Sequence, residues 1–410
     1  MRRYLQVLRA RRFRLLWLGA TASSFGDGVS LLALIWLVYV TGGSATKLGW
    51  FVAAYTAPVV VGGPLVGAAL DCFDRRLIMI ADNLMRGVVV GLLPLLSYHH
   101  ALHLWQLYGF AVLYGFLKMI PLAGVPTVIP DLVAVEDFDA ANALESISFY
   151  LSAIAGPAAA GLLIAEIGAI NVLWLDAASY FAFAFALVRV GPLPRAPRAE
   201  HAEARTIRHS LRFVAGIPIL LATTVMFMFV NIGEGIVEVI TPVYVRQVLV
   251  AGAATYGALV AVAGAAGLAG AFAAGASASR IPLGRAIALS EIAAGCAYAI
   301  LAGKPPLALT FVGLAVGALC LGPLTVWAQT VRMRLIPPDM RGRVFGTMRT
   351  LMQATPPLGA LLAGTLLRHG GIPVAAAAIG VVLIVPAIIA LVTGALSQTE
   401  RASAVVDNQT

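Results

Sequence analysis

Two ionisable side chains stand inside stretches of sequence that are long and apolar enough to cross a lipid bilayer. Asp27 lies in the apolar run 13–39, and Lys118 lies in the apolar run 102–129. A charged side chain at the centre of a bilayer costs about 2.5–3.5 kcal/mol on insertion scales, so such residues are usually kept for a function or for a partner. We therefore expect this chain to move an ion or a solute.

The surroundings of Asp27 suit a group that exchanges protons. Asp27 lies about 21 Å along its predicted helix, somewhat beyond the middle of the bilayer. Small polar residues occur at 21–26, just before it, and can line water. A carboxyl group that is partly removed from water holds a proton more readily, so Asp27 is a candidate for proton coupling. The alternative is that it only bonds to a neighbouring helix.

Lys118 lies at nearly the same depth, about 17 Å from the end of its predicted helix. From that depth the side chain cannot easily extend to the membrane surface. Two roles stay open for it: an ion pair with a carboxylate on another helix, such as Asp27, and the binding of an anionic group of a substrate. In either role we expect Lys118 to line a central cavity.

A later apolar run, 214–242, places two carboxylates on one face of a helix. Glu234 and Glu238 are four residues apart and therefore share a face. Neighbouring carboxylates repel, which favours protonation of at least one of them and suits proton coupling. Glu234 is the better candidate, because Glu238 is nearer the outer end, where water can solvate it. Asn231 adds a hydrogen-bonding group nearby and is a candidate for lining the substrate cavity.

Other polar side chains in the apolar runs have simpler interpretations. Gln353 is a further candidate for lining a substrate cavity. Asp82 and Arg86 are four residues apart and can neutralise each other, so they predict a structural ion pair. Asp176 and Glu291 have no partner that the sequence identifies.

These residues belong to a chain that is too apolar to be a soluble protein. Hydrophobic residues make up 60% of its 410 residues, charged residues make up 11%, and the mean hydropathy is +0.91. A soluble domain carries about 25% charged residues, so we predict an all-α integral membrane protein. Twelve apolar stretches approach the roughly 20 residues that span a bilayer: 13–40, 46–70, 76–97, 102–129, 141–165, 169–188, 214–242, 253–278, 283–302, 306–331, 344–367 and 372–396.

The net charge of +9 indicates orientation in the membrane rather than nucleic-acid binding. Arginines cluster before the first stretch and in the connections after stretches 2, 6, 8 and 10. By the positive-inside rule, we expect both termini in the cytoplasm of a multi-pass plasma membrane protein, in a bacterial inner membrane. The acidic connection 133–140 is an exception to this rule. The first stretch is too long for a signal peptide and predicts an anchor.

The sequence shows no pattern typical of a metal centre, a cofactor site or an enzyme. Cys72, Cys296 and Cys320 are scattered without the spacing of metal ligands or disulfides. A phosphate-binding loop, a dinucleotide fingerprint and a hydrolase nucleophile motif are all missing from the sequence. We therefore expect no metal, no cofactor and no enzymatic activity.

A charged segment that contains prolines divides the chain into halves of six stretches each. It occupies 189–212 and predicts a cytoplasmic linker between an N-terminal bundle at 1–188 and a C-terminal bundle at 213–396. Residues 397–410 would form a cytoplasmic tail.

The two halves also share a weak repeat. Residues 137–163 and 337–364 align at an offset of 200, which places Pro157 over Pro357. Two parallel six-helix repeats with a site at the membrane midplane are a recurrent plan among transporters.

With this pattern, the whole chain resembles the major facilitator superfamily of transporters. GAALDCFDRR at 67–76 is similar to the family's loop 2–3 motif, and GPAAAG at 156–161 is similar to the Gly-Pro signature of its antiporter branches. The segments FRLLWLGATASSFGDG and PPDMRGRVFGTMRT look most like the branch that holds macrolide-efflux proteins and the enterobactin exporter. The resemblance implies two six-helix bundles that work by alternating access.

The resemblance also implies a cytoplasmic gate in the loop 2–3 motif, formed by Gly67, Asp71, Asp74, Arg75 and Arg76. In the family, the first Asp meets the N-terminal end of helix 11, here 340–344, where the helix dipole favours a negative charge. This chain has Cys72 where the family has Arg, and Asp74 where Gly is common. The loss of that Arg calls into question its usual relay to an acidic residue of helix 4, here Asp131. The alternative is that the arginines only set the orientation.

The fifth apolar stretch contains Gly156, Pro157 and Gly161. The glycines allow close contact with neighbouring helices, and the proline removes a backbone hydrogen bond and bends the helix. An ordinary packing kink has the same physical signature. The resemblance associates this motif with antiporters.

We predict a secondary active transporter that exports an amphipathic small molecule, drug-like or siderophore-like, in exchange for protons. We expect it to work as a monomer in the lipid bilayer, without a nucleic-acid partner. A lipid or lysophospholipid flippase of the same superfamily is the alternative, and it would use Lys118 to bind a phosphate. A membrane scaffold or sensor that transports nothing explains the buried charges less well.

Overall fold

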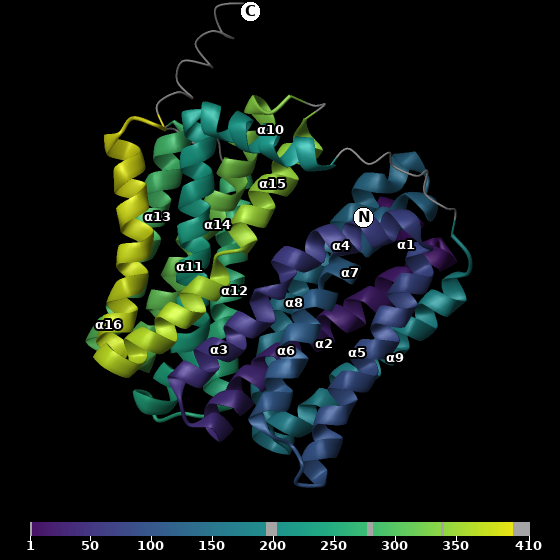
Figure 1. Cartoon of the computed structure of the whole chain (residues 1–410), viewed down its shortest axis with the longest axis horizontal. Coiled ribbons are helices and arrows are strands. Elements are labelled where there is room, and N and C mark those ends of the chain that lie inside the picture. The colour runs from purple at the N-terminus through teal and green to yellow at the C-terminus, as the bar shows by residue number, and fades with distance from the viewer. Residues whose placement is uncertain (1, 194–202, 277–281, 338–339, 397–410) are drawn as a thin grey trace, which may run out of the picture. The chain divides into compact units, whose positions relative to one another are not determined.

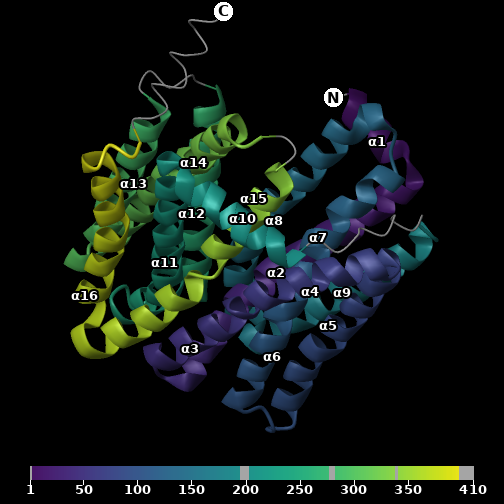
Figure 2. The same ribbon diagram turned by 45° about the horizontal axis from the view of Figure 1, so that its top comes forward.

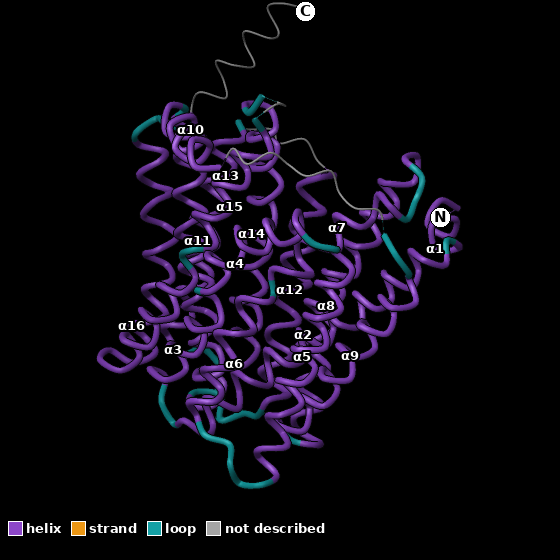
Figure 3. The backbone as a smooth tube through the Cα atoms, turned by 45° about the vertical axis from the view of Figure 1, so that its right-hand side comes forward, coloured by secondary structure: helices purple, strands orange, loops and turns teal. Residues whose placement is uncertain are grey.

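The computed structural model describes residues 2–193, 203–276, 282–337 and 340–396, which form helices joined by short connections (Figure 3). Among these residues no strand occurs, and ten helical spans are long and apolar enough to cross a membrane. The predicted all-α membrane fold is therefore confirmed.

The helices of the first half are α1 (Arg2–Arg9), α2 (Arg11–Gly42), α3 (Ala45–Thr56), α4 (Pro58–Cys72), α5 (Arg75–Tyr98), α6 (Leu104–Leu117), α7 (Met119–Val128), α8 (Phe138–Ile167) and α9 (Ala169–Val190). Those of the second half are α10 (Glu203–Gly216), α11 (Pro218–Gln247), α12 (Ala253–Ala276), α13 (Leu283–Ala299), α14 (Leu307–Leu335), α15 (Arg341–Gln353) and α16 (Pro356–Val392). Three short 3-10 helices, η1 (Ile129–Asp131), η2 (Val135–Asp137) and η3 (Ile300–Gly303), join some of them.

Ten spans fit the twelve predicted crossings because one predicted crossing is divided and the last two are counted as one. The predicted stretch 46–70 is divided into α3 and α4 at Ala57, where the next residue, Pro58, has no N–H to continue the helix. The last two stretches are counted as one span because α16 contains both, with only a kink between them at Gly371, whose φ of 68° lies in the left-handed region that glycine tolerates.

Three local features differ from the sequence prediction. The short helix α1 precedes the first crossing, and α10 is helical where part of the linker 189–212 is predicted. The predicted stretch 344–367 is divided at Ala354–Thr355, because α16 begins there with a pair of prolines.

The chain forms two compact units, which we call the N-terminal unit and the C-terminal unit. The N-terminal unit comprises residues 1–200 and 251–261. Within it, α9 packs along α2 and α5, and α2 also packs along α8 (Figures 1 and 2). Apolar side chains of α2, α5, α6 and α9, such as Leu16, Met79, Leu117 and Phe183, form its core.

The C-terminal unit comprises residues 201–250 and 262–410. Within it, α11 packs along α16, and α13 packs along both α14 and α16. Its core contains apolar side chains of these four helices, such as Met226, Ile287, Ala328 and Ala387.

Candidate functional site

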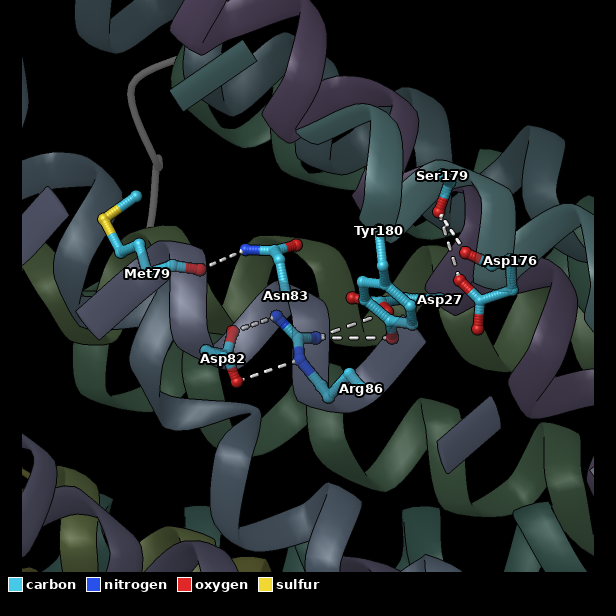
Figure 4. A network of polar contacts seen from close by, with 8 residues as sticks. All are labelled: Asp27, Met79, Asp82, Asn83, Arg86, Asp176, Ser179 and Tyr180. Atoms are coloured by element: carbon cyan, nitrogen blue, oxygen red, sulfur yellow. Dashed lines mark hydrogen bonds and ion pairs between the residues drawn. The ribbon is translucent and has the colours of Figure 1, made fainter. Parts of the chain in front are cut away.

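A group of charged side chains lies inside the N-terminal unit, where α2, α5 and α9 meet (Figure 4). Its centre is Arg86 of α5. The Nε of Arg86 donates a hydrogen bond to Oδ1 of Asp82 at 3.0 Å, and its Nη2 donates to Oδ2 of the same carboxylate. The predicted ion pair between Asp82 and Arg86 is confirmed.

The same guanidinium group also joins α5 to α2 and α9. Its Nη1 lies 3.7 Å from Oδ1 of Asp27 and donates to the hydroxyl of Tyr180 at 3.3 Å. The Tyr180 hydroxyl in turn donates to Asp27. The Arg86 Cζ lies 4.4 Å from the centroid of the Tyr180 ring, within the range of a cation–π contact. One cation therefore contacts side chains from three helices.

The two carboxylates that contact Arg86 differ in their exposure to solvent. The side chain of Asp82 is 0% exposed and that of Arg86 is 1% exposed, whereas the side chain of Asp27 is 24% exposed. Asp82 and Arg86 are thus fixed as a buried pair. Asp27 is the more exposed of the two carboxylates that contact Arg86.

A third carboxyl group, Asp176, lies on α9 one turn before Tyr180. It is fully buried, and its Oδ1 lies 3.3 Å from the Ser179 hydroxyl. Gly26 of α2 permits this arrangement, because a Cβ at that position would overlap Asp176 and Ser179. We refer to Asp27, Asp82, Arg86, Asp176 and Tyr180 as the Arg86 cluster.

The charges of the Arg86 cluster do not balance. It holds one cation and three carboxyl groups, so the fully ionised cluster would have two uncompensated negative charges. Uncompensated charge in a buried site is strongly unfavourable. We therefore expect the cluster to bind protons.

Lys118 lies at the break between α6 and α7 and is half-buried. Its Nζ lies 5.3 Å from the centroid of the Tyr55 ring, and this ring stacks on Tyr114 at 5.0 Å. Arg86 lies on the same aromatic pair, with its Cζ 5.8 Å from the Tyr114 centroid. Asp27 contacts Arg86 and Tyr180, so the ion pair between Lys118 and Asp27, one of the two roles left open for Lys118, does not occur in the described structure.

Gly115 allows α6 to approach the break between α3 and α4. Substituting Ala for Gly115 is expected to destabilise the protein by about 1–3 kcal/mol, because overpacking forces neighbouring atoms apart. The new Cβ would overlap the Tyr55 carbonyl oxygen and lie 3.3 Å from Pro58 Cδ. The melting temperature of the purified protein in detergent measures the effect. Gly109→Ala on the same helix is the control, since no described atom outside its own helix backbone lies within 4 Å of its added Cβ. Equal melting of the two variants would contradict the prediction.

The loop 2–3 motif makes contacts within the N-terminal unit. Arg75 pairs with Asp131 at 3.8 Å and donates to the Thr127 carbonyl oxygen at 2.8 Å. Asp131 is the acidic residue that the family's Arg would contact, and in this chain it pairs with Arg75 instead. Cys72, which replaces that Arg, is exposed. The side chain of Asp71 lies outside the described residues.

The other motif residues stabilise helix ends. Asp74 caps α5 by accepting hydrogen bonds from the backbone N–H groups of Arg76 and Leu77. Arg76 donates to the Leu187 carbonyl oxygen at 2.7 Å near the C-terminal end of α9, where a positive charge is favourable. Gly67 is half-buried, and beyond its own helix no described atom lies within 4 Å of the place that a Cβ would take.

The glycines of α8 allow close helix contacts, as the sequence predicts. A Cβ on Gly156 would lie 3.1 Å from the Cα of Gly28 on α2, and a Cβ on Gly161 would lie 3.1 Å from the Cα of Gly257 on α12. Pro157 is buried inside α8 between these contacts. The role of this motif in antiport stays a prediction.

The two carboxylates of α11 do not belong to the Arg86 cluster, because they lie in the other unit. Glu234 is exposed and Glu238 is half-buried. Their role in proton coupling stays a prediction.

The predicted cavity residues of the C-terminal unit are Asn231 and Gln353. Both lie near the junction of α15 and α16, Asn231 as part of α11 and Gln353 as the last residue of α15. Asn231 donates from Nδ2 to the Met352 carbonyl oxygen at 2.9 Å, and Thr355 donates to the Met228 carbonyl oxygen at 2.9 Å. Gln353 lies at the end of α15 and is half-buried. The Asn231 amide therefore holds the junction against α11.

Sequence reasoning misses Asp176 and Tyr180 as members of the site. The available signal is their spacing, because they are four residues apart on α9, as Asp82 and Arg86 are on α5. Two polar side chains at this spacing in an apolar helix indicate a buried polar face. The spacing does not say which helix packs against that face.

Comparisons with known proteins place the chain among transporters. A family model described as transmembrane secretion effector matches residues 4–409. The multidrug efflux pump Tap of Mycolicibacterium fortuitum is 28% identical over 409 residues, which covers 95% of this chain and 97% of that protein. The macrolide efflux protein A of Streptococcus pyogenes is 25% identical over 235 residues, which covers 53% and 56% of the two chains.

Solved structures share the fold at low sequence identity. The nucleoside transporter NupG has a TM-score of 0.75 at 12% identity, with coverage of 93% of this chain and 98% of that chain. A bacterial homologue of the iron transporter ferroportin in an inward-facing state has a TM-score of 0.70 at 15% identity, with coverage of 92% and 98%.

Proposed function

The chain belongs to the transmembrane secretion effector family of the major facilitator superfamily, and on that basis we propose that it exports amphipathic small molecules in exchange for protons. Two similar proteins are named as a multidrug efflux pump and a macrolide efflux protein, which supports export of compounds of this kind. We further propose that it works as a monomer in the plasma membrane with both termini in the cytoplasm.

The observation that best supports proton coupling is the position of Asp27 in the Arg86 cluster. Ionised Asp27 shares Arg86 with Asp82 and accepts the hydrogen bond from Tyr180. When Asp27 binds a proton, Arg86 keeps Asp82 as its charged partner, and the attraction between α2 and α5 weakens. A proton that binds one conformation more tightly than another shifts the population toward it. Protonation of Asp27 therefore biases how three packed helices hold together.

For the substrate, we propose that a polar or anionic group binds near Lys118. The break between α6 and α7 leaves this ammonium group half-buried beside Tyr55, where it pairs with no described carboxylate. The Tyr55–Tyr114 stack lies between Lys118 and Arg86. A substrate that displaces Lys118 from Tyr55 would thus disturb the packing beside the Arg86 cluster.

Everted membrane vesicles with an imposed proton gradient test this function. They are expected to accumulate ethidium and erythromycin, and nigericin is expected to abolish the accumulation because it removes the pH gradient. Vesicles from cells without the protein provide the background. Accumulation that persists after nigericin and follows a sodium gradient would refute proton coupling, and absence of any accumulation of either probe would refute export of amphipathic drugs.

A further inference from the structure

A second carboxyl group, far from the Arg86 cluster in sequence, is buried without a partner in the described part of the chain. Glu291 of α13 is 0% exposed, and neither of its carboxylate oxygens has a hydrogen-bond partner among the described residues. It belongs to the C-terminal unit, whereas the Arg86 cluster belongs to the N-terminal unit. Its presence is therefore not explained by the site described above.

The position of Glu291 on α13 shows which helix it faces. Gly284, Glu291 and Gly295 lie on one face of α13, because their spacings of seven and four residues return to the same side. A Cβ on Gly284 would overlap Leu396, and a Cβ on Gly295 would lie 2.7 Å from Ile384. Glu291 thus faces the segment between Ile384 and Leu396, most of which belongs to α16. Residues 373–392 of α16 contain no ionisable side chain.

The neighbouring helix α14 offers no cation at the level of Glu291. Ser290 donates a hydrogen bond to the Cys320 carbonyl oxygen, which fixes the register between α13 and α14. Cys320 is the one ionisable residue of α14 between 307 and 331. Arg332 lies twelve residues further, about 18 Å along the helix, where its Cζ packs 4.7 Å from the centroid of the Phe227 ring.

Other ionisable groups near α13 do not neutralise Glu291 either. Arg285 is exposed and, six residues earlier, points to a different face of α13. Tyr298 is buried and not a cation, and η3 contains no ionisable residue. The helix α11, which packs on α16, contributes the carboxylates Glu234 and Glu238 at its middle.

We infer that Glu291 is a second proton-binding site of this transporter, occupied in the conformation that the structure shows. An ionised carboxylate without a partner in a packed interior is too unfavourable to persist, so the group holds its proton. The protonated group still buries a hydroxyl that donates to no acceptor among the described residues, and this carries a cost. A second conformation that hydrates or pairs Glu291, and so releases its proton, accounts for an acid at this position.

The inference rests on the proposed proton-coupled export, and it adds a proton to each transport cycle. The proton leaves the Glu291 hydroxyl and the negative charge stays on its carboxylate. At a gradient of one pH unit, loss of one coupled proton lowers the limiting accumulation about tenfold, since one unit is worth about 1.4 kcal/mol per proton.

Infrared spectroscopy of the purified protein in liposomes tests the occupied site without any transport. The difference between wild type and Glu291→Gln at neutral pH is expected to contain the C=O stretch of a protonated carboxyl group. The Asp27→Asn variant is expected to keep that band. If the difference spectrum between wild type and Glu291→Gln lacks this band, the inference is overturned.

Accumulation of ethidium in proteoliposomes tests the release of the proton. Glu291→Gln is expected to accumulate about tenfold less ethidium than wild type at a gradient of one pH unit, with an unchanged melting temperature. Equal accumulation would show that Glu291 keeps its proton throughout and would overturn its part in transport. If wild type itself ignores the pH gradient while the infrared band is present, the proposed function fails and the proton-binding site stands.

Discussion

Replacing Asp27 by Asn is expected to lower the accumulation of ethidium driven by a gradient of one pH unit by about tenfold or more, while exchange of ethidium across the membrane without a gradient continues. Asparagine keeps an oxygen that can accept the Tyr180 hydrogen bond, and Arg86 keeps its bonds to Asp82. The fold should therefore persist. The variant cannot ionise, so it behaves as a carrier that never releases its proton.

The control for Asp27→Asn is Glu166→Gln, because Glu166 is an exposed carboxylate near the end of α8. This control is expected to accumulate ethidium as the wild type does. Melting temperatures of both variants show whether they are folded. A folded Asp27→Asn protein that concentrates ethidium as strongly as the wild type does, and loses this ability with nigericin, would exclude Asp27 as a coupling carboxylate.

The second large effect concerns stability rather than transport. Arg86→Met is expected to lower the free energy of unfolding by about 3–5 kcal/mol, because it leaves a buried carboxylate without its counterion. Asp82 is fully buried, and the hydrogen bonds recorded for its side chain come from Arg86. Thermal melting and denaturant titration of the purified protein in detergent measure the loss.

A double variant separates the cost of a broken pair from the net value of the pair. Asp82→Leu with Arg86→Met removes both buried charges, and its stability should return to within about 1–2 kcal/mol of wild type, since apolar side chains of similar volume often replace a buried ion pair. Asp27 tolerates the double change because it is partly exposed and keeps the Tyr180 hydroxyl. A double variant as unstable as Arg86→Met alone would show that the pair is irreplaceable.

Much of the fold could be predicted because membrane helices are recognisable by their length and low polarity. The predicted stretch 13–40, which contains Asp27, corresponds to α2 with boundaries shifted by two residues at each end, and the predicted stretch 169–188 corresponds to α9. The irregular points were harder. Pro58 marks the break between α3 and α4, yet Pro157 lies inside the continuous helix α8, because packing decides whether a proline bends or ends a helix.

The candidate site could be predicted only in its separate parts. Asp27 stands out because it is charged, and the Asp82–Arg86 pair stands out because of its spacing. That they share one guanidinium group depends on which faces of α2, α5 and α9 pack together, and periodicity alone does not contain this information. Tyr180 was missed because aromatic residues are common in membrane helices. Lys118 has two possible partners, a carboxylate on another helix and an anionic group of a substrate, and its local sequence does not favour either one.

The bend at Gly371 bears on how this protein can be mapped. The final two crossings meet at a single residue of left-handed backbone and not at a loop, so no stretch of free chain separates the two helices. Proteases and inserted reporter tags need several residues of free chain to act or to be accommodated. At this end of the membrane, such methods would find no connection to cut or to label. They would count these two crossings as one, and would thereby assign the C-terminus to the wrong side.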